Sequence, residues 1–86
     1  MPEIARFYGL IIKMFYRDHL PPHFHVEYQD FEGVFEISTM EMIEGELPSR
    51  AKILAVEWAL IHRKELEDNW ERRTKGETIK HIEPLP

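Results

Sequence analysis

The hydrophobic pattern of this chain changes period once, at Pro48, and that change limits the folds open to it. Before Pro48, aromatic and β-branched residues follow the period-two pattern of strands. From Pro48 onward, apolar residues recur every three to four positions, as in an amphipathic helix. The sequence therefore predicts an α+β fold, in which a small antiparallel sheet packs on one long C-terminal helix in the order β-β-β(-β)-α.

Three to four strands are predicted within a sheet of about residues 6–46. The first covers 6–16, with Gly9 marking a bulge or a close backbone approach, and the second covers 23–28. A third strand over 33–38 and a short fourth over 42–45 are joined by a turn at 39–41. Because the connections are short, we expect an antiparallel meander.

The helix is predicted over about residues 48–73. Pro48 suits the first helical turn and Gly76 suits a stop, which leaves a tail at 77–86 where Pro84 and Pro86 exclude a helix. A helical wheel predicts a sheet-facing stripe of Ala51, Leu54, Ala55, Trp58, Ile61, His62, Glu65 and Leu66.

A second apolar patch falls on the opposite side of this helix, at Ile53, Val56 and Leu60. A helix on a single sheet needs only one apolar stripe, so this patch calls for another explanation. Three readings stay open: scattered surface aliphatics, cover by the tail, or an interface with a second copy or another protein.

Chain length, cysteine content and charge limit the number of domains, the cell compartment and the class of partner. The chain has 86 residues, which predicts a single domain over residues 1–86, and it has no cysteine, which favours a reducing cytoplasm. Neither a signal peptide nor a membrane span is apparent, so we expect a soluble protein. Residues 1–47 hold three basic and nine acidic residues, a net charge of −6, which disfavours nucleic acid as a partner.

Residues 18–28, DHLPPHFHVEY, carry the main chemical signal of the chain. His23 and His25 share one face of a strand with Glu27, and their side chains start about 7 Å apart. His19 can join them from the proline turn. The candidate ligands of a divalent metal are therefore His19, His23, His25 and Glu27, with zinc the natural ion and iron, manganese and nickel as alternatives.

Two other readings of the histidines remain open. Acid–base chemistry on RNA or a nucleotide would use His23, His25 and His62, because His62 lies on the sheet-facing stripe with Glu65 three residues further on. Alternatively, the histidines beside a proline-restricted turn only bind carbonyl groups and stack on aromatic rings. The spacing H-x3-H-x-H is not a metal signature, and no phosphate loop, G-x-S-x-G motif or cysteine nucleophile is present.

The segments ARFYGLIIKMFYRDHLPPHFHVEY, GELP and VEWALIHRKELEDNW resemble the bacterial and archaeal family known as domain of unknown function 4160. The resemblance runs from about Pro2 to Trp70, and its most distinctive element is D-H-x-P-P-H-F-H, where Leu20 replaces a common asparagine or similar small residue. It implies a small stand-alone protein, often encoded beside another short protein as in toxin–antitoxin or regulatory operons. The residues that match the family pattern and can carry chemistry are Asp18, His19, His23, His25, Glu27, His62 and Asn69.

Together these observations predict a small cytoplasmic interaction or regulatory module of a toxin–antitoxin-like operon, which pairs through Ile53, Val56 and Leu60. The alternative is a histidine site, at His19, His23 and His25, that binds a divalent metal or performs acid–base chemistry.

Overall fold

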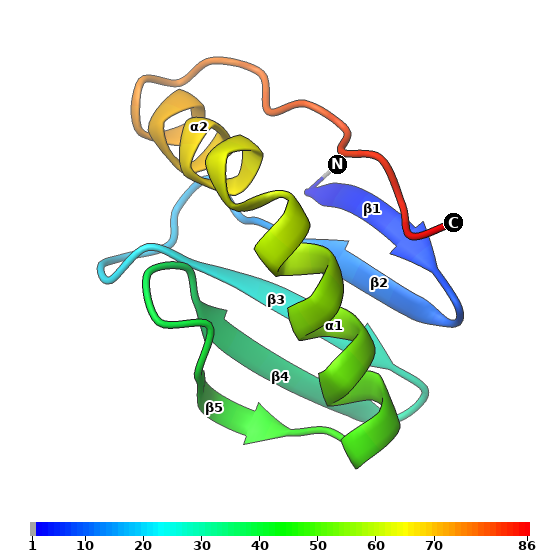
Figure 1. Cartoon of the computed structure of the whole chain (residues 1–86). Helices are drawn as coiled ribbons and strands as arrows, with labels where there is room; N and C mark the ends of the chain where they lie inside the picture. The colour runs from blue at the N-terminus through cyan, green and yellow to red at the C-terminus, as the bar shows by residue number, and fades with distance from the viewer. Residues whose placement is uncertain (1) are drawn as a thin grey trace.

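In the described part of the chain, five strands form one antiparallel sheet, side by side in the order in which they follow along the chain (Figure 1). The computed structural model describes residues 2–86. The elements are β1 (Glu3–Phe7), β2 (Leu10–Lys13), β3 (His23–Tyr28), β4 (Phe31–Glu36), β5 (Met42–Glu46), α1 (Ser49–Ile61) and α2 (Arg63–Thr74). The α+β class and the antiparallel meander are confirmed, whereas the predicted three to four strands and single helix are wrong in number.

The extra strand arises within residues 6–16, where a tight turn divides the predicted single strand. Tyr8 and Gly9 have φ values of 48° and 84° and link β1 to β2. Positive φ at both central positions is typical of the type I′ turn of hairpins. The turn sets Phe7 opposite Leu10, so that both side chains enter the same core, whereas one continuous strand would point them to opposite faces.

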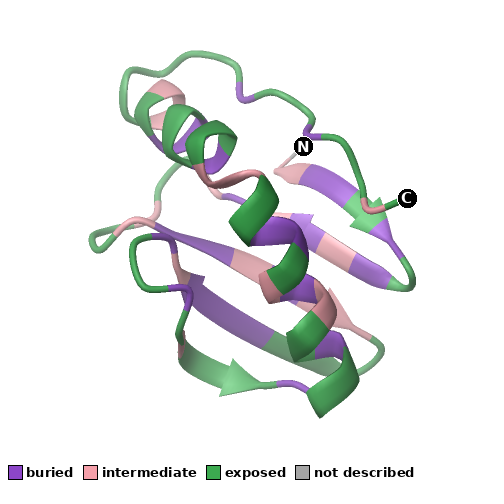
Figure 2. Ribbon diagram, in the orientation of Figure 1, coloured by how far each residue is buried: buried purple, intermediate pink, exposed green. Residues whose placement is uncertain are grey.

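The core lies between α1 and the inner face of the sheet (Figure 2). Phe24 and Phe35 stack with ring centroids 5.5 Å apart, and the ring of Trp58 lies 6.2 Å from that of Phe24. Small side chains let α1 approach these rings closely, because its sheet-facing residues include Ala51, Ala55 and Ala59. The predicted stripe is therefore rotated about the helix axis, and its placement of Ile61 and Glu65 against the sheet is wrong, because both residues are exposed.

The predicted helix over 48–73 is divided at His62. This residue has φ −111° and ψ 26°, and its backbone N–H is shared between the carbonyls of Trp58 and Ala59, at 3.2 Å each. Neither proline nor glycine lies at the break, so the sequence carries no ordinary signal for it. Within residues 2–86, neither helix combines the length and the apolar character that crossing a membrane requires.

The tail lies between the helices and the outer edge of β1, with the chain end beside the β1–β2 turn (Figure 1). Ile82 donates its backbone N–H to the carbonyl of Ile4 at 2.8 Å, and Trp58 Nε1 donates to the carbonyl of Glu83 at 2.8 Å. As predicted, residues 77–86 form no helix. Because Ile79 and Ile82 are buried, the tail is part of the core.

The opposite face of the sheet, called the outer face below, is not covered by α1, and within residues 2–86 α2 reaches it at the start of β3, where Trp70 packs on His23. Direct pairing places Glu27, Glu32 and Glu46 in one row across β3, β4 and β5. Gly45 has φ 87°, and a Cβ atom at this position would lie 2.1 Å from the carbonyl oxygen of Glu32. This close approach needs glycine, and it fixes how β5 lies against Glu32.

Candidate functional site

The candidate site is built where the loop after β2 meets the first residues of β3. The Leu20–Pro21 peptide bond is cis, and the loop that contains it carries Asp18 back toward the start of β3. Because β3 alternates, Phe24 enters the core while His23 and His25 point to the outer face. Their ring centroids are 5.2 Å apart.

One carboxylate oxygen joins the two imidazoles. Asp18 Oδ2 lies 3.1 Å from His23 Nε2 and 3.0 Å from His25 Nε2. These three residues each offer one ligand atom, and the three atoms all lie within 4.8 Å of one another. We call this group the Asp18–His23–His25 cluster. It joins two histidines singled out by the motif to an aspartate that the sequence identified only through the family resemblance.

Hydrogen bonding fixes the proton of His23. Its Nδ1 lies 2.7 Å from the carbonyl oxygen of Pro21. A carbonyl only accepts, so Nδ1 must be the donor, and in a neutral ring Nε2 then bears a lone pair. That lone pair faces Asp18 Oδ2, which also only accepts when ionised. Two acceptors 3.1 Å apart require a cation between them, either a proton or a metal ion.

In His25, one ring nitrogen has no hydrogen-bond partner among the described residues. Its Nε2 donates to Asp18 at 3.0 Å, which leaves Nδ1 as the acceptor nitrogen. That Nδ1 is buried and has no hydrogen-bond partner in the described part of the chain. The nearby Glu32 Oε2 is 3.7 Å away, beyond hydrogen-bond length.

Side chains of α2 hold the cluster in place. Trp70 packs on His23 with ring centroids 5.2 Å apart, and the Arg73 guanidinium stacks 3.7 Å above the Trp70 ring. Arg73 also donates to the carbonyls of Tyr16 and Asp18, at 2.9 Å each. The loop that carries the carboxylate is therefore tied to a helix more than fifty residues later, a role for Arg73 that the sequence did not suggest.

Other sequence candidates lie outside this cluster. His19 is exposed, with its ring 6.2 Å from that of His23, and both line a shallow cavity of about 120 Å³. Glu27 pairs with Lys13 at 2.8 Å. His62 lies at the helix break, where its Nδ1 is 2.5 Å from Glu65 Oε1.

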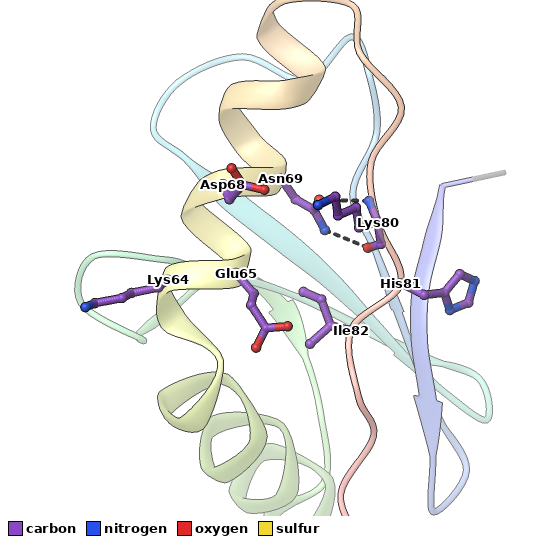
Figure 3. A pocket seen from close by; sticks show the side chains of 7 residues that line it. All are labelled: Lys64, Glu65, Asp68, Asn69, Lys80, His81 and Ile82. Carbon is purple, nitrogen blue, oxygen red and sulfur yellow. Dashed lines mark hydrogen bonds between the residues drawn. The ribbon is translucent and has the colours of Figure 1, made fainter.

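A larger hollow of about 270 Å³ lies between α2 and the tail (Figure 3). Asn69 exchanges two hydrogen bonds with the backbone of Lys80 there, at 2.9 Å each, and so its amide anchors the tail. Lys64 and His81 line its two sides, and the ends of their side chains extend in opposite directions (Figure 3). Asp68 pairs with Arg72, whose hydrogen bond lowers the pKa of the Asp68 carboxyl. Asn69 therefore serves to attach the tail, whereas Asp68 and Arg72 pair with each other within α2.

The predicted interface residues form an apolar groove on the outer side of α1. Ile53 is 65% exposed and Leu60 54% exposed, and Val56 is half-buried between them. We call these three residues the outer α1 face. The tail does not cover it, because its contacts run to β1 and to the other side of the helices.

A family model described as domain of unknown function (DUF4160) matches residues 9–71. The matched region runs from the β1–β2 turn to α2, and it includes all three members of the Asp18–His23–His25 cluster and Trp70. No curated protein and no solved structure matches the chain.

Proposed function

The chain belongs to the domain of unknown function 4160 family, and because that description carries no activity, we propose from the site itself that the protein binds a divalent transition-metal ion. Asp18, His23 and His25 are the proposed ligands. The observation that carries the proposal is the 3.1 Å contact between His23 Nε2 and Asp18 Oδ2, in which both atoms are acceptors.

A metal ion suits this contact better than a proton does. A proton on His23 Nε2 would create an imidazolium that is only 6% exposed, and it would leave His25 Nδ1 without a partner. A metal ion instead uses both Nε2 atoms and the carboxylate. Ligand atoms about 2.0–2.1 Å from a tetrahedral ion lie roughly 3.3 Å apart, close to the 3.0 and 3.1 Å between Asp18 and the two histidines.

The donor set also bears on the ion and its chemistry. Two imidazoles and one carboxylate suit zinc, iron, manganese or nickel, and three protein ligands leave positions open for water or substrate. Such an ion can activate a bound water for hydrolysis. The outer face around the cluster carries Glu32, Glu44 and Glu46, so a polyanion such as RNA is a poorer substrate than a small or cationic one.

Titration with zinc, nickel and manganese tests the proposal. We expect untagged protein to bind one equivalent of zinc at micromolar or lower concentration, and Asp18→Asn and His23→Ala/His25→Ala to lose this binding. His81→Ala, which removes an exposed histidine of the tail, should bind like the wild type. Isothermal calorimetry gives the stoichiometry, and circular dichroism shows whether each variant keeps its fold.

A wild type that binds none of the three ions would contradict the proposal, as would undiminished binding by Asp18→Asn. Histidine side-chain NMR of the wild type then identifies the alternative. Protons on both nitrogens of His23, together with absent metal binding, would mean that a proton fills the contact with Asp18.

A second function is supported by the outer α1 face. We propose that the protein also works as an interaction module, in which Ile53, Val56 and Leu60 pair with a second copy of the chain or with a small protein encoded next to it, as in a toxin–antitoxin operon. Its support is the 65% exposure of Ile53 and the 54% exposure of Leu60 on one face of a helix whose other side is buried.

Light scattering after size exclusion tests the self-association form. We expect the wild type to elute at twice its 10.4 kDa mass and Ile53→Glu to elute as a monomer, because a charge in the middle of an apolar interface costs desolvation energy. Ile61→Glu is the matched control, since Ile61 is also 65% exposed but lies off this face. A monomeric wild type at high concentration, or a dimer of Ile53→Glu, would contradict self-association.

A further inference from the structure

Two buried side-chain nitrogens lack a hydrogen-bond partner in the described residues, and both belong to the candidate site. They are His25 Nδ1 and Arg73 Nε. A buried polar atom without a partner is costly, so it calls for a group that supplies the missing partner, such as an ion, a water molecule or a side chain in another state. His25 Nδ1 therefore suggests a second state of the cluster in which this nitrogen is used.

Metal binding defines that state. His25 faces Asp18 with Nε2, so to share an ion with Asp18 it uses the Nε2 lone pair, and its proton must move to Nδ1. His23 already has this arrangement, because its Nδ1–H is donated to the Pro21 carbonyl. Metal-bound histidines nearly always donate the other ring N–H to a carbonyl or carboxylate, which fixes the tautomer and the ring orientation. His25 needs an equivalent acceptor.

Glu32 is placed to be that acceptor. Its Oε2 lies 3.7 Å from His25 Nδ1, so a shift of about 1 Å makes a charge-assisted hydrogen bond. The Glu32 side chain is 56% exposed, so it has room to make that shift. The β3–β4 pairing sets Val34 directly opposite His25, with Glu32 two residues away on the same face.

Local charge also favours this movement. Glu32 lies between Glu27 and Glu46 in the row across the outer face, and like charges directly opposite one another are unfavourable. Lys13 pairs with Glu27, whereas Glu32 faces His25 Nδ1 at 3.7 Å, a nitrogen that carries no proton in the metal-free cluster. A proton on His25 Nδ1 would therefore reduce the repulsion that Glu32 experiences from Glu27 and Glu46 in the metal-free state.

We propose that Glu32 is a positioning residue of the metal site: it accepts the Nδ1–H of His25 when Nε2 of the same ring binds the ion. This inference rests on the proposed metal function and deepens it. Two neutral imidazoles and the Asp18 carboxylate would hold the ion, and Asp18 and Glu32 together supply two negative charges, which match a divalent cation. Metal binding then moves the His25 proton from Nε2 to Nδ1 and draws Glu32 toward the ring.

Zinc titration of Glu32→Gln, with Glu46→Gln as the control, tests this role. The two variants remove the same charge from opposed positions on adjacent strands, but only Glu32 lies beside His25. We expect Glu32→Gln to weaken zinc binding 10- to 100-fold, as loss of an outer-shell partner does elsewhere, and Glu46→Gln to weaken it less than threefold. In NMR spectra of the zinc-loaded wild type, we expect the His25 proton on Nδ1 with slow exchange, and fast exchange in Glu32→Gln.

The outcomes separate this role from the metal site itself. If the wild type binds zinc and the two variants bind it equally well, Glu32 has no positioning role and the metal site stands. A His25 proton that stays on Nε2 in the zinc-loaded wild type also overturns the inference. If the wild type binds no metal, both proposals fail.

Discussion

Replacing Trp58 with alanine is expected to remove about 3–5 kcal/mol from the free energy of unfolding. Trp58 is fully buried, and its ring lies 5.5 Å from that of Phe7 and 6.2 Å from that of Phe24. Its Nε1–H also holds the tail through the carbonyl of Glu83. Because the free energy of unfolding of small domains is only about 5–15 kcal/mol, this loss would remove a large part of the stability of the protein. Chemical denaturation followed by circular dichroism measures it.

Trp58→Phe is the informative companion variant. It keeps an aromatic ring in the core but removes the N–H, so the carbonyl of exposed Glu83 loses its donor, at a cost of about 0.5–1.5 kcal/mol. The difference between the two variants separates core packing from tail attachment. A loss below about 1.5 kcal/mol in Trp58→Ala would mean that the residue is not the centre of the core.

Removing Arg73 is expected to impair both stability and metal binding. Its guanidinium donates to the carbonyls of Tyr16 and Asp18 and stacks on Trp70, so Arg73→Ala frees the loop that carries the Asp18 carboxylate. Hydrogen bonds to charged groups contribute about 1.5–3 kcal/mol each. Because the two hydrogen bonds of Arg73 are partly solvent-accessible, we expect the free energy of unfolding to fall by about 2–3 kcal/mol. Zinc affinity should fall at least tenfold, because one ligand is no longer held in position.

Arg72→Ala is the matched control on the same helix. Arg72 pairs with Asp68 in solvent, where the hydrogen bond lowers the pKa of Asp68 and raises that of Arg72. Such exposed pairs add little to stability, so the unfolding midpoint and zinc affinity should stay close to those of the wild type. Equal effects of the two substitutions would show that charge on α2, and not attachment of the loop, is what matters.

Local patterns were enough to predict part of this site. Period-two alternation correctly predicted β3 over residues 23–28, and with it His23 and His25 on one face. It could not predict the β1–β2 hairpin, because the type I′ turn places Tyr8 where asparagine, aspartate or glycine is usual. The pattern therefore predicts one strand over residues 6–16.

Tertiary contacts account for what the patterns left out. Asp18 reaches the histidines because Arg73 holds its loop from far along the chain, and no spacing in the sequence reports such a contact. The break at His62 also lacks a local signal, and the pattern left Ala59 outside the sheet-facing stripe although it is fully buried. Glu32 becomes a neighbour of His25 only once the β3–β4 register is known.

The buried tail has a consequence for how the protein is made. Ile82 pairs with Ile4, and Glu83 accepts from Trp58, so the last core contacts join residues from nearly opposite ends of the chain. A ribosome releases residues in order, and the strands of the meander can pair as they emerge. However, the outer edge of β1 and one side of Trp58 remain exposed to solvent until residues 79–83 have left the exit tunnel. During that interval a nascent chain exposes an unpaired strand edge, which makes it a substrate for chaperones and prone to association with neighbouring chains.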